Sequence, residues 1–329
     1  MVLDYIDPGY GNKMLNSDGT ALADNITIVE NDTYNPFGGV AFTCTNGNAM
    51  LPVSMVIMPT TSGIFNTMSL KFSVYCGKNI DVANSLVAGF YGAYTSNNTI
   101  YPLWGSVHIN DNNFYMDVFR GASNVLIGDV DEGFHNITVS ITQGRRDTMN
   151  EITTTVHVDN IGKSATFSSH VNNPWYIPAR CYINLPSSDH YVSNVIYGRG
   201  GILSPQLQVV KLPISKALLD GMKLSEDKSH YIATSVDQSC LLTIDTAELA
   251  KTYDTNLPVS HIVVGGYPCY AQNGAANITG ISKENGEVTT HGSCSVSNDS
   301  LGAASTFWAL EDKKISDLAN IQVGWKAGA

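Results

Sequence analysis

The sequence predicts an all-β protein, and three observations support this prediction. Apolar and polar residues alternate with a period of two in several segments, glycines and Asn-Gly pairs separate these segments, and no helical periodicity of useful length occurs before residue 213. Many short strands without intervening helices are typical of a sandwich of antiparallel sheets. We therefore expect such a sandwich in the first two-thirds of the 329 residues.

The clearest predicted strand is MSLKFSVYC, residues 68–76, in which every second residue from Met68 to Cys76 is apolar. The intervening residues, Lys71 among them, fall on the opposite face, so the segment predicts a half-buried antiparallel strand. Residues 135–142 and 151–159 alternate in the same way. The polar loop between them starts at Gly144, which predicts a hairpin with a long loop. Further strands are expected at 86–90, 105–109, 113–119 and 191–197.

Near the N-terminus, the segment NPFGGVAFTCTNGNAMLPV contains two short apolar runs on either side of Asn46-Gly47. The runs are too short for helices, and an Asn-Gly pair between apolar runs favours a hairpin or a bulge. The segment contains no candidate catalytic residue, so we expect it to serve only as structural scaffold.

The character of the sequence changes after about residue 205, which predicts two domains. Residues 1–204 would form the sandwich, with 1–20 as an N-terminal arm, and residues 205–329 would form a smaller, mainly β domain. In that domain two similar units, 238–266 and 304–328, each contain an apolar strand, a short acidic helix and another apolar strand. Asp245 or Thr246 is the expected cap of the first helix. A core around Trp308 and Trp325 is expected, and one chain does not decide whether the units are a true repeat.

Charge and hydropathy exclude two classes of partner. The chain has 18 Lys and Arg against 29 Asp and Glu, a formal net charge of −11, and its longest basic runs are only two residues long. Nucleic-acid binding requires a basic stripe, so we expect no nucleic-acid partner. No stretch approaches the roughly 20 apolar residues of a membrane helix, and no secretory signal is recognisable at the N-terminus, so we expect cytosolic synthesis without membrane insertion.

The six cysteines predict buried thiols and no metal centre. The two nearest cysteines in the sequence are 25 residues apart, so the C-x-x-C spacing of zinc and redox sites is missing. We expect free structural thiols, although an even count leaves disulfides open. The segment GDVDEG, with Asp129, Asp131 and Glu132, has oxygens suited to calcium but is equally typical of a solvated turn. We expect no metal and no cofactor.

Several of these segments resemble the concanavalin A-like, laminin-G-like jelly rolls of bacteriophage and bacterial surface proteins. The order Phe-Gly-Gly, apolar strand, Asn-Gly turn and MSLKFSVYC resembles the start of that fold. DEGFHNITVSI resembles a segment in which a Trp-His pair opens a strand, with Phe134 in the usual Trp position. TTTVHVDNIGK resembles the next strand, with an Asp159-Asn160 turn where Asp-Gly is usual, and RCYINLPSSDHYVSNVIYGRG resembles the closing strands. The resemblance covers about residues 20 to 200 and implies a jelly roll of a virion surface or tail protein.

Some members of that fold are glycosidases, and their chemistry can be checked against the sequence. A retaining glycosidase holds two carboxyl groups about 5 to 5.5 Å apart. Asp111 and Asp117 are six residues apart, which corresponds to roughly 20 Å along an extended strand. Glu151 and Asp159 lie at opposite ends of their predicted strand and not together in its middle. No serine, cysteine or histidine arrangement suggests a nucleophile, so we expect no enzymatic activity.

One segment has the composition of a binding surface. AGFYGAYTSNNTIYPLW, residues 88–104, places Tyr91, Tyr94, Tyr101 and Trp104 around a polar TSNNT tip. Aromatic faces stack on sugar rings, and asparagine side chains orient hydroxyls, so these four residues are the candidate ligand-binding site. The alternative, that the rings belong to the sandwich core or lie on a sheet face, stays open.

These observations lead to two hypotheses about function. The first is a non-enzymatic virion structural protein, a tail-associated adhesin or a head decoration, made in the host cytoplasm and displayed on the virion surface. Its partners would be other virion proteins, further copies of itself in a homo-oligomer, and host cell-surface glycans. The second is a free bacterial carbohydrate-binding lectin, and a degenerate glycosidase is a remote third. Assembly state separates the first two, because a virion component forms a fixed symmetric oligomer.

Overall fold

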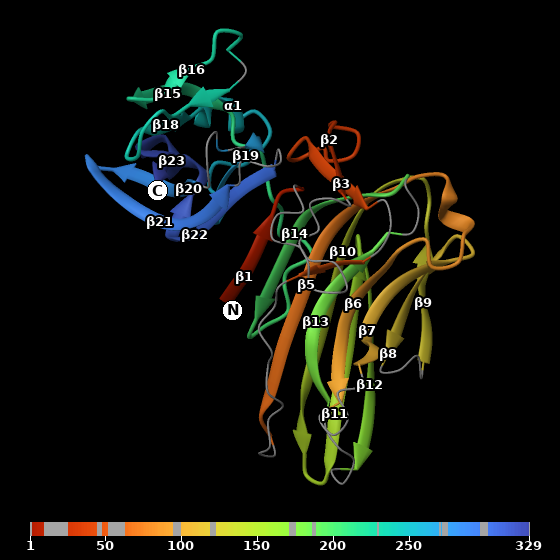
Figure 1. The fold of residues 1–329 in the computed structure, drawn as a ribbon. Helices are drawn as coiled ribbons and strands as arrows, with labels where there is room; N and C mark the ends of the chain where they lie inside the picture. Colours follow the sequence, from red (N-terminus) through yellow and green to blue (C-terminus); the bar gives the residue numbers. More distant parts are fainter. Residues whose placement is uncertain are drawn as a thin grey trace. The chain divides into compact units, whose positions relative to one another are not determined.

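The computed structural model describes residues 2–9, 26–44, 48–51, 63–94, 100–118, 123–170, 176–185, 189–228, 230–269, 271, 276–296 and 302–328. The chain divides into two compact units, Met1–Val210 and Lys211–Ala329 (Figure 1). Within the described residues the only α-helix is the single turn α1, Thr246–Leu249, and nearly all other regular structure is β-strand. The predicted all-β class is confirmed. No helix among these residues has the length and apolar character needed to cross a membrane.

The first unit is a sandwich of two antiparallel sheets with jelly-roll connectivity. One sheet has the order β12-β11-β10-β5-β14-β3-β2, with β1 paired to β14, and the other has the order β4-β13-β6-β7-β8-β9. Strands distant in sequence are therefore neighbours, as β5 is of β14. The strands of the first sheet are β1 (Val2–Asp7), β2 (Ile26–Glu30), β3 (Val40–Cys44), β5 (Phe65–Cys76), β10 (Gly133–Arg146), β11 (Met149–Val158), β12 (Ile161–His170) and β14 (Tyr191–Arg199). Those of the second are β4 (Asn48–Leu51), β6 (Val87–Tyr94), β7 (Ile100–Asn110), β8 (Asn113–Val118), β9 (Ser123–Asp129) and β13 (Tyr176–Asn184).

The core between the two sheets follows from the predicted alternation. Leu70, Phe72 and Val74 of β5 are fully buried, and Val107 and Met116 of the second sheet belong to the same cluster. Burying one such side chain stabilises the fold by about 1.5–3 kcal/mol. The strands predicted at 86–90, 105–109, 113–119 and 191–197 are present as β6, β7, β8 and β14.

A two-residue turn replaces the long loop that the sequence predicted between β10 and β11. The strands continue to Arg146 and Met149, which pair directly, so the turn consists of Asp147 and Thr148. The prediction of a long loop at Gly144 was wrong because Asp147 adopts a left-handed φ of 51°, which permits a tight turn. Asp159 also has a φ of 51° and begins the predicted turn between β11 and β12.

The apolar runs on either side of Asn46-Gly47 do not pair with each other. The first becomes β3, which pairs with β2 and β14, while the second contains β4, which pairs with β13 of the other sheet. The hairpin reading was wrong because each run finds its backbone partners in a different sheet. Residues 45–47 themselves lie outside the described part of the chain.

The outer face of β5 is buried, which the sequence did not predict. Lys71 is 1% exposed, and its Nζ donates a hydrogen bond to the carbonyl oxygen of Pro205 at 2.7 Å. The backbone N–H of Leu203 donates to Ser69 Oγ at 3.2 Å. Residues 201–205 therefore form a strap over this face. They belong to the first unit, which continues to Val210, past the boundary expected after residue 204. Burial lowers the pKa of Lys71 to about 8.

The N-terminal residues add a strand to the first sheet. Residues 2–7 of the expected arm form β1, which pairs with β14. The Arg199 side chain donates two hydrogen bonds to the Asp4 carboxylate, at 2.6 and 2.7 Å. The buried Asp7 carboxylate accepts hydrogen bonds from the Tyr5 hydroxyl and the Gly9 N–H. These polar contacts fix β1 to the sandwich.

Four of the cysteines are buried free thiols, as predicted for them: Cys44, Cys76, Cys181 and Cys240. Burial raises the pKa of Cys44 to about 12 and that of Cys240 to about 11. Because the thiolate is the reactive form, these cysteines behave as small apolar residues.

The second unit is a small β domain. A five-stranded sheet has the order β15-β18-β23-β20-β21, and two further pairs are β16-β17 and β19-β22. The bounds are β15 (Ile214–Asp220), β16 (Lys223–Leu224), β17 (Tyr231–Ile232), β18 (Ser239–Ile244), β19 (Pro258–Cys269), β20 (Ala276–Glu284), β21 (Glu287–Val296), β22 (Gly302–Lys314) and β23 (Ile321–Gly328). The buried Trp308 belongs to its core, and Trp325 packs against that core, as predicted. Asp245 caps α1 by accepting from the Glu248 N–H at 3.0 Å, whereas Ile315–Asn320, the second expected helix, is 3-10.

The pair His135–Asp159 ties β10 to the β11–β12 turn and predicts a pH dependence. His135 Nδ1 and Asp159 Oδ2 lie 2.9 Å apart. Burial alone lowers the pKa of His135, but the contacts with Asp159 and Asp131 outweigh burial and leave it raised above 6.5. Burial alone raises the pKa of Asp159, but the hydrogen bonds from His135 and Asn136 leave it lowered below 3.8.

The pair therefore stabilises the fold most between pH 3.8 and 6.5. The contribution of His135 is lost as the pH rises through its raised pKa, and that of Asp159 as the pH falls through its lowered pKa. We expect the stability difference between the native protein and Asp159→Asn, measured by urea unfolding at several pH values, to be largest in this window. Glu30→Gln, at an exposed position of β2, is the control. A difference that does not vary with pH would contradict the assignment.

Candidate functional site

Three partly exposed tyrosines form an aromatic surface at one end of the sandwich, called here the tyrosine platform: Tyr34, Tyr75 and Tyr191. Tyr75 ends the outward row of β5, and the register places Tyr191 of β14 directly opposite it. The Tyr34 ring stacks on the Tyr191 ring with centroids 3.9 Å apart and planes 9° apart, and meets the Tyr75 ring edge-on at 5.0 Å. On the other side of Tyr75, Phe134 of β10 continues the row.

The Phe-Gly-Gly stretch of the sequence positions Tyr34. The buried Asn35 side chain accepts from the Gly38 N–H at 3.0 Å and donates to the Val40 carbonyl at 2.7 Å. Gly39 takes a left-handed φ of 68° and its N–H donates to the Asn35 carbonyl at 2.8 Å. Glycine adopts this φ without the steric cost that a Cβ would add, which suits the second glycine to the position. The loop from 31 to 39 is thus closed around Asn35, and it holds Tyr34 over the sheet.

Polar groups border the tyrosine platform. The Tyr75 hydroxyl donates to Glu132 Oε1 at 3.3 Å, and Asn79 Nδ2 donates to Asp189 Oδ2 at 2.8 Å. Burial and the Glu132 carboxylate raise the pKa of Tyr75, while burial and Tyr34 raise that of Tyr191. Both hydroxyls therefore stay protonated and can donate as well as accept hydrogen bonds. Aromatic faces beside carboxylate and amide groups are the chemistry that recognises a polyol with apolar C–H faces.

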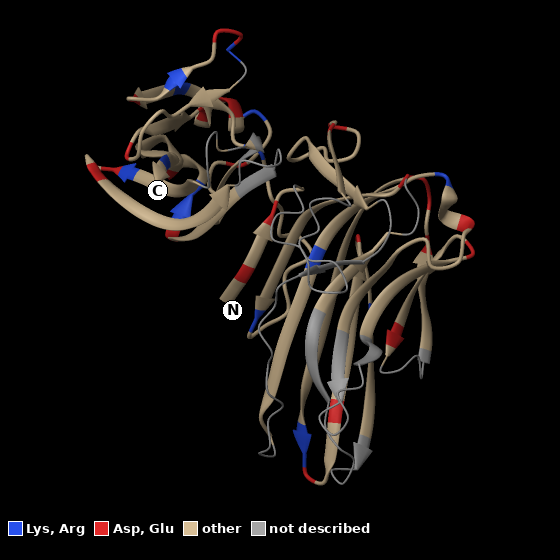
Figure 2. Ribbon diagram, viewed as in Figure 1, with Lys and Arg blue, Asp and Glu red and all other residues tan. Residues whose placement is uncertain are grey.

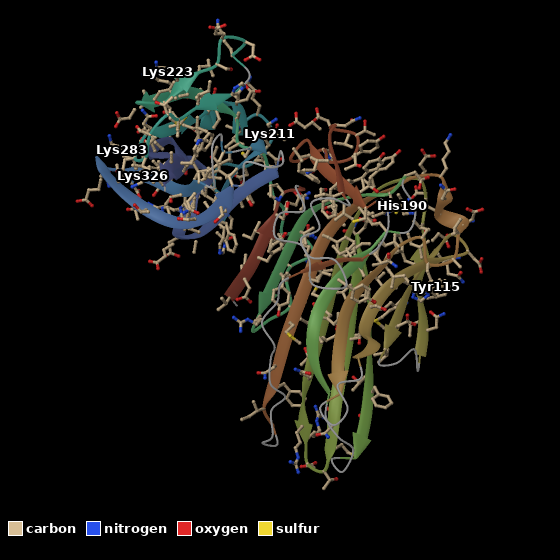
Figure 3. All side chains as sticks on the ribbon, viewed as in Figure 1. Tyr115, His190, Lys211, Lys223, Lys283 and Lys326 are labelled. Atoms are coloured by element: carbon tan, nitrogen blue, oxygen red, sulfur yellow. The ribbon has the colours of Figure 1, made fainter. Side chains whose placement is uncertain are left out.

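Beneath this surface, Ser85, His190 and Asp189 are arranged like the nucleophile, general base and orienting carboxylate of a catalytic triad. His190 Nε2 lies 3.3 Å from Ser85 Oγ, and its Nδ1 lies 3.0 Å from Asp189 Oδ1. The sequence did not reveal this group, because Ser85 and His190 are 105 residues apart. Both side chains are fully buried, and burial lowers the pKa of His190. Figure 3 labels His190. The Gly77 N–H donates to Nδ1 at 3.3 Å, which competes with the tautomer that a catalytic triad needs. The group is an internal link that fixes Asp189.

A second polar group lies on the outer face of the six-stranded sheet. Ser106 is opposite Asp117 and His108 is opposite Tyr115, and His108 Nδ1 lies 3.0 Å from Asp117 Oδ2. Ser106, His108 and Asp117 are buried. Tyr115, labelled in Figure 3, is partly exposed. Within the described strands of this sheet, the acidic residues are Asp117 and Asp129. Asp111 lies in the turn before β8, where its φ is 47°.

The aromatic residues predicted as a binding site lie on two paired strands. Tyr91 and Tyr94 belong to β6, Tyr101 and Trp104 belong to β7, and the register places Gly92 opposite Tyr101. The side chains of these four residues and the tip at 95–99 lie outside the described part of the chain. The site therefore remains a prediction.

In the described part of the chain, neither a metal site nor a basic patch adds to these features. Among the described residues, no group of three or more His, Cys, Asp or Glu side chains is arranged to hold a metal ion. Figure 2 shows the charged residues of the described part of the first unit mainly at turns and strand ends, with long uncharged stretches between them.

Comparisons with known proteins give weak structural likenesses. No family model matches the chain, and no curated protein matches it. Lectin II from Ulex europaeus is similar with a TM-score of 0.31 and 12% identity, over 54% of this chain and 93% of that chain. The lectin UEA-II complexed with galactose gives 0.29 and 12%, over 60% and 98%. Arcelin-5, a lectin-like defense protein from Phaseolus vulgaris, gives 0.28 and 14%, over 60% and 97%. These TM-scores carry no argument about function, and nothing in these matches points to a bacteriophage.

Proposed function

We propose that this chain is a non-enzymatic glycan-binding protein of a virion surface, and that the tyrosine platform is its sugar contact. The observation that carries the proposal is the arrangement of three partly exposed tyrosine rings beside Glu132, Asp189 and Asn79. The rings supply flat apolar surface, and the polar side chains supply hydrogen bonds to hydroxyl groups. The binding energy would come from stacking, and the polar groups would select the sugar.

A binding role is favoured over catalysis by the surroundings of the acidic and nucleophilic groups. Ser85 and His190 are fully buried, so a substrate does not reach them. Asp117 is paired with His108, and Asp129 is the last residue of β9, so the described strands of the second sheet offer no adjacent carboxylates. A glycosidase needs two such groups on either side of one bond.

The virion assignment rests on the resemblance of the sequence to jelly rolls of bacteriophage surface proteins. The net charge of −11 is consistent with a protein that stays dispersed at high concentration. Other virion proteins and further copies of this chain would be its partners, on a tail or on a head. A free bacterial lectin is the second candidate. It would bind glycan without associating with particles, so co-purification with particles separates the two.

Substitution in the tyrosine platform tests the sugar contact. We expect Tyr191→Ala and Tyr34→Ala each to weaken binding to surface polysaccharides on a glycan array, by about tenfold, which corresponds to about 1.4 kcal/mol. The reason is that either change removes one ring of the stacked pair. Tyr115→Ala removes a partly exposed tyrosine from the other sheet and is the matched control.

Two outcomes would contradict this site. Unchanged binding by correctly folded Tyr191→Ala and Tyr34→Ala would exclude the tyrosine platform. If Tyr94→Ala and Trp104→Ala weaken binding instead, without a change in melting temperature, the glycan contact lies on the predicted segment 88–104.

A further inference from the structure

The edge strand β15 of the second unit has an unusual composition for an exposed edge. Within the described residues it pairs with β18 alone. Leu218 and Leu219 are 38% and 39% exposed, and Ile214 is 43% exposed. An exposed edge with apolar side chains is a template for pairing with another chain, and proteins usually protect such edges with charges, bulges or prolines.

The strand at the opposite edge of the same sheet, β21, is less apolar than β15. The strand β21, EVTTHGSCSV, consists mostly of small and polar residues, and Val288 is its exposed apolar residue. In β15 the bulge at Ser215 lies at the start of the strand, so residues 216–220 keep a regular register with β18. This regular segment has one Lys and one Asp.

The charges of β15 complement each other when the strand meets a second copy of itself in antiparallel orientation. If the two-fold axis passes through Leu218, Lys216 of one copy lies opposite Asp220 of the other, and Leu218 lies opposite its own equivalent. Any shift of the register separates Lys216 from Asp220. Opposite charges and apolar residues directly across a strand pair stabilise the pair, whereas like charges destabilise it. The edge is thus complementary to itself in one register.

We propose that two copies of this chain associate through β15, in this register, to form a continuous ten-stranded sheet from two five-stranded sheets. The interface is isologous, because the same strand of both copies forms it, and it closes as a dimer. It belongs to the second unit and does not depend on the proposed glycan contact.

The face that carries Lys216, Leu218 and Asp220 extends the interface. A groove of ≈ 370 Å³ on this face is lined by Leu218, Leu241 and Ile281 and by two lysines, Lys283 and Lys326, which are labelled in Figure 3. Pairing at Leu218 places the grooves of the two copies on either side of the axis, so that one continuous apolar band crosses the dimer. Leu224 and Ile232 of the β16–β17 hairpin, which follows β15 in the chain, are also exposed, at 42% and 40%.

Charge reversal tests the register. Sedimentation equilibrium of the full chain at rising concentration should show a monomer–dimer equilibrium. We expect Lys216→Glu and Asp220→Lys each to raise the dimer Kd about tenfold or more, because each replaces two attractive contacts by two repulsive ones. The double variant, Lys216→Glu with Asp220→Lys, restores both contacts and should recover the native Kd. Lys163→Glu, an exposed position of β12, is the control for net charge.

Circular dichroism melting curves identify any variant that fails to fold. Leu218→Asp places two carboxylates at the axis and should abolish the dimer while leaving the monomer folded. A native chain that stays monomeric throughout, or a dimer that Lys216→Glu leaves unchanged, would overturn the proposal. A folded double variant that does not recover the native Kd would overturn the register and with it the proposal.

Discussion

Lys71→Met is expected to abolish a rise in stability that the native protein shows between about pH 8 and pH 10.5. Burial lowers the pKa of Lys71 from 10.5 to about 8, so in this range the unfolded chain binds a proton that the folded chain does not. Stability then increases with pH. The shift corresponds to about 3 kcal/mol over the whole range. Below pH 8 the ammonium is charged in both states, and the folded state bears the cost of burying it.

Removing the buried charge has a second consequence at neutral pH. Methionine fills a similar volume without a charge, so Lys71→Met should be as stable as the native protein or more stable, although the Pro205 carbonyl loses its donor. Urea unfolding of both proteins at pH 7 and at pH 10.5 measures the effect. From pH 7 to pH 10.5, the free energy of unfolding of the native protein should rise by about 3 kcal/mol relative to that of Lys71→Met. Equal pH profiles of the two proteins would contradict the lowered pKa of Lys71. Lys163→Met, at an exposed position, is the control.

Asn35→Ala is expected to destabilise the sandwich by about 3 kcal/mol and to weaken glycan binding as well. The Asn35 side chain joins the Val40 carbonyl, the Gly38 N–H and Asn194, and it is fully buried. Each buried polar group that loses its partner costs about 1–3 kcal/mol. The loop that carries Tyr34 also loses its internal support.

Thermal unfolding and the glycan array together check this prediction. Asn124→Ala, at an exposed position of β9, should change stability by no more than about 0.5 kcal/mol. If Asn35→Ala were as stable as the native protein, the loop would not depend on the Asn35 contacts. If it were less stable but bound glycan normally when folded, Tyr34 would not belong to the contact surface.

The sequence predicts the strands of this protein well, because burial on one face leaves a period of two that one chain shows directly. The strands predicted at 68–76 and 135–142 follow from that pattern, and the structure extends them to Phe65–Cys76 and Gly133–Arg146. The pattern does not say which strands pair. The sequence alone therefore favoured a hairpin or a bulge at Asn46-Gly47, although the two runs pair in different sheets.

The tyrosine platform could not be predicted for the same reason. Tyr34, Tyr75 and Tyr191 are far apart in the sequence, and only the register between β5 and β14 brings two of them together. The signal that could have suggested it is weaker: Tyr75 is an aromatic residue on the polar side of an alternating strand. The burial of Lys71 was missed because the strap that covers it comes more than a hundred residues later.

The pairing of β1 with β14 decides how the first unit transmits a mechanical load. Val2 lies opposite Arg199, so the start of the first strand and the end of the last strand meet at one side of the sheet. A pulling force that enters near Val2 and leaves after Arg199 opens the β1–β14 pair like a zipper, one hydrogen bond at a time, beginning beside the Arg199–Asp4 ion pair. The far end of this path reaches the tyrosine platform, because the Asn35 side chain, which supports the loop that carries Tyr34, donates a hydrogen bond to the Pro8 carbonyl at 3.2 Å.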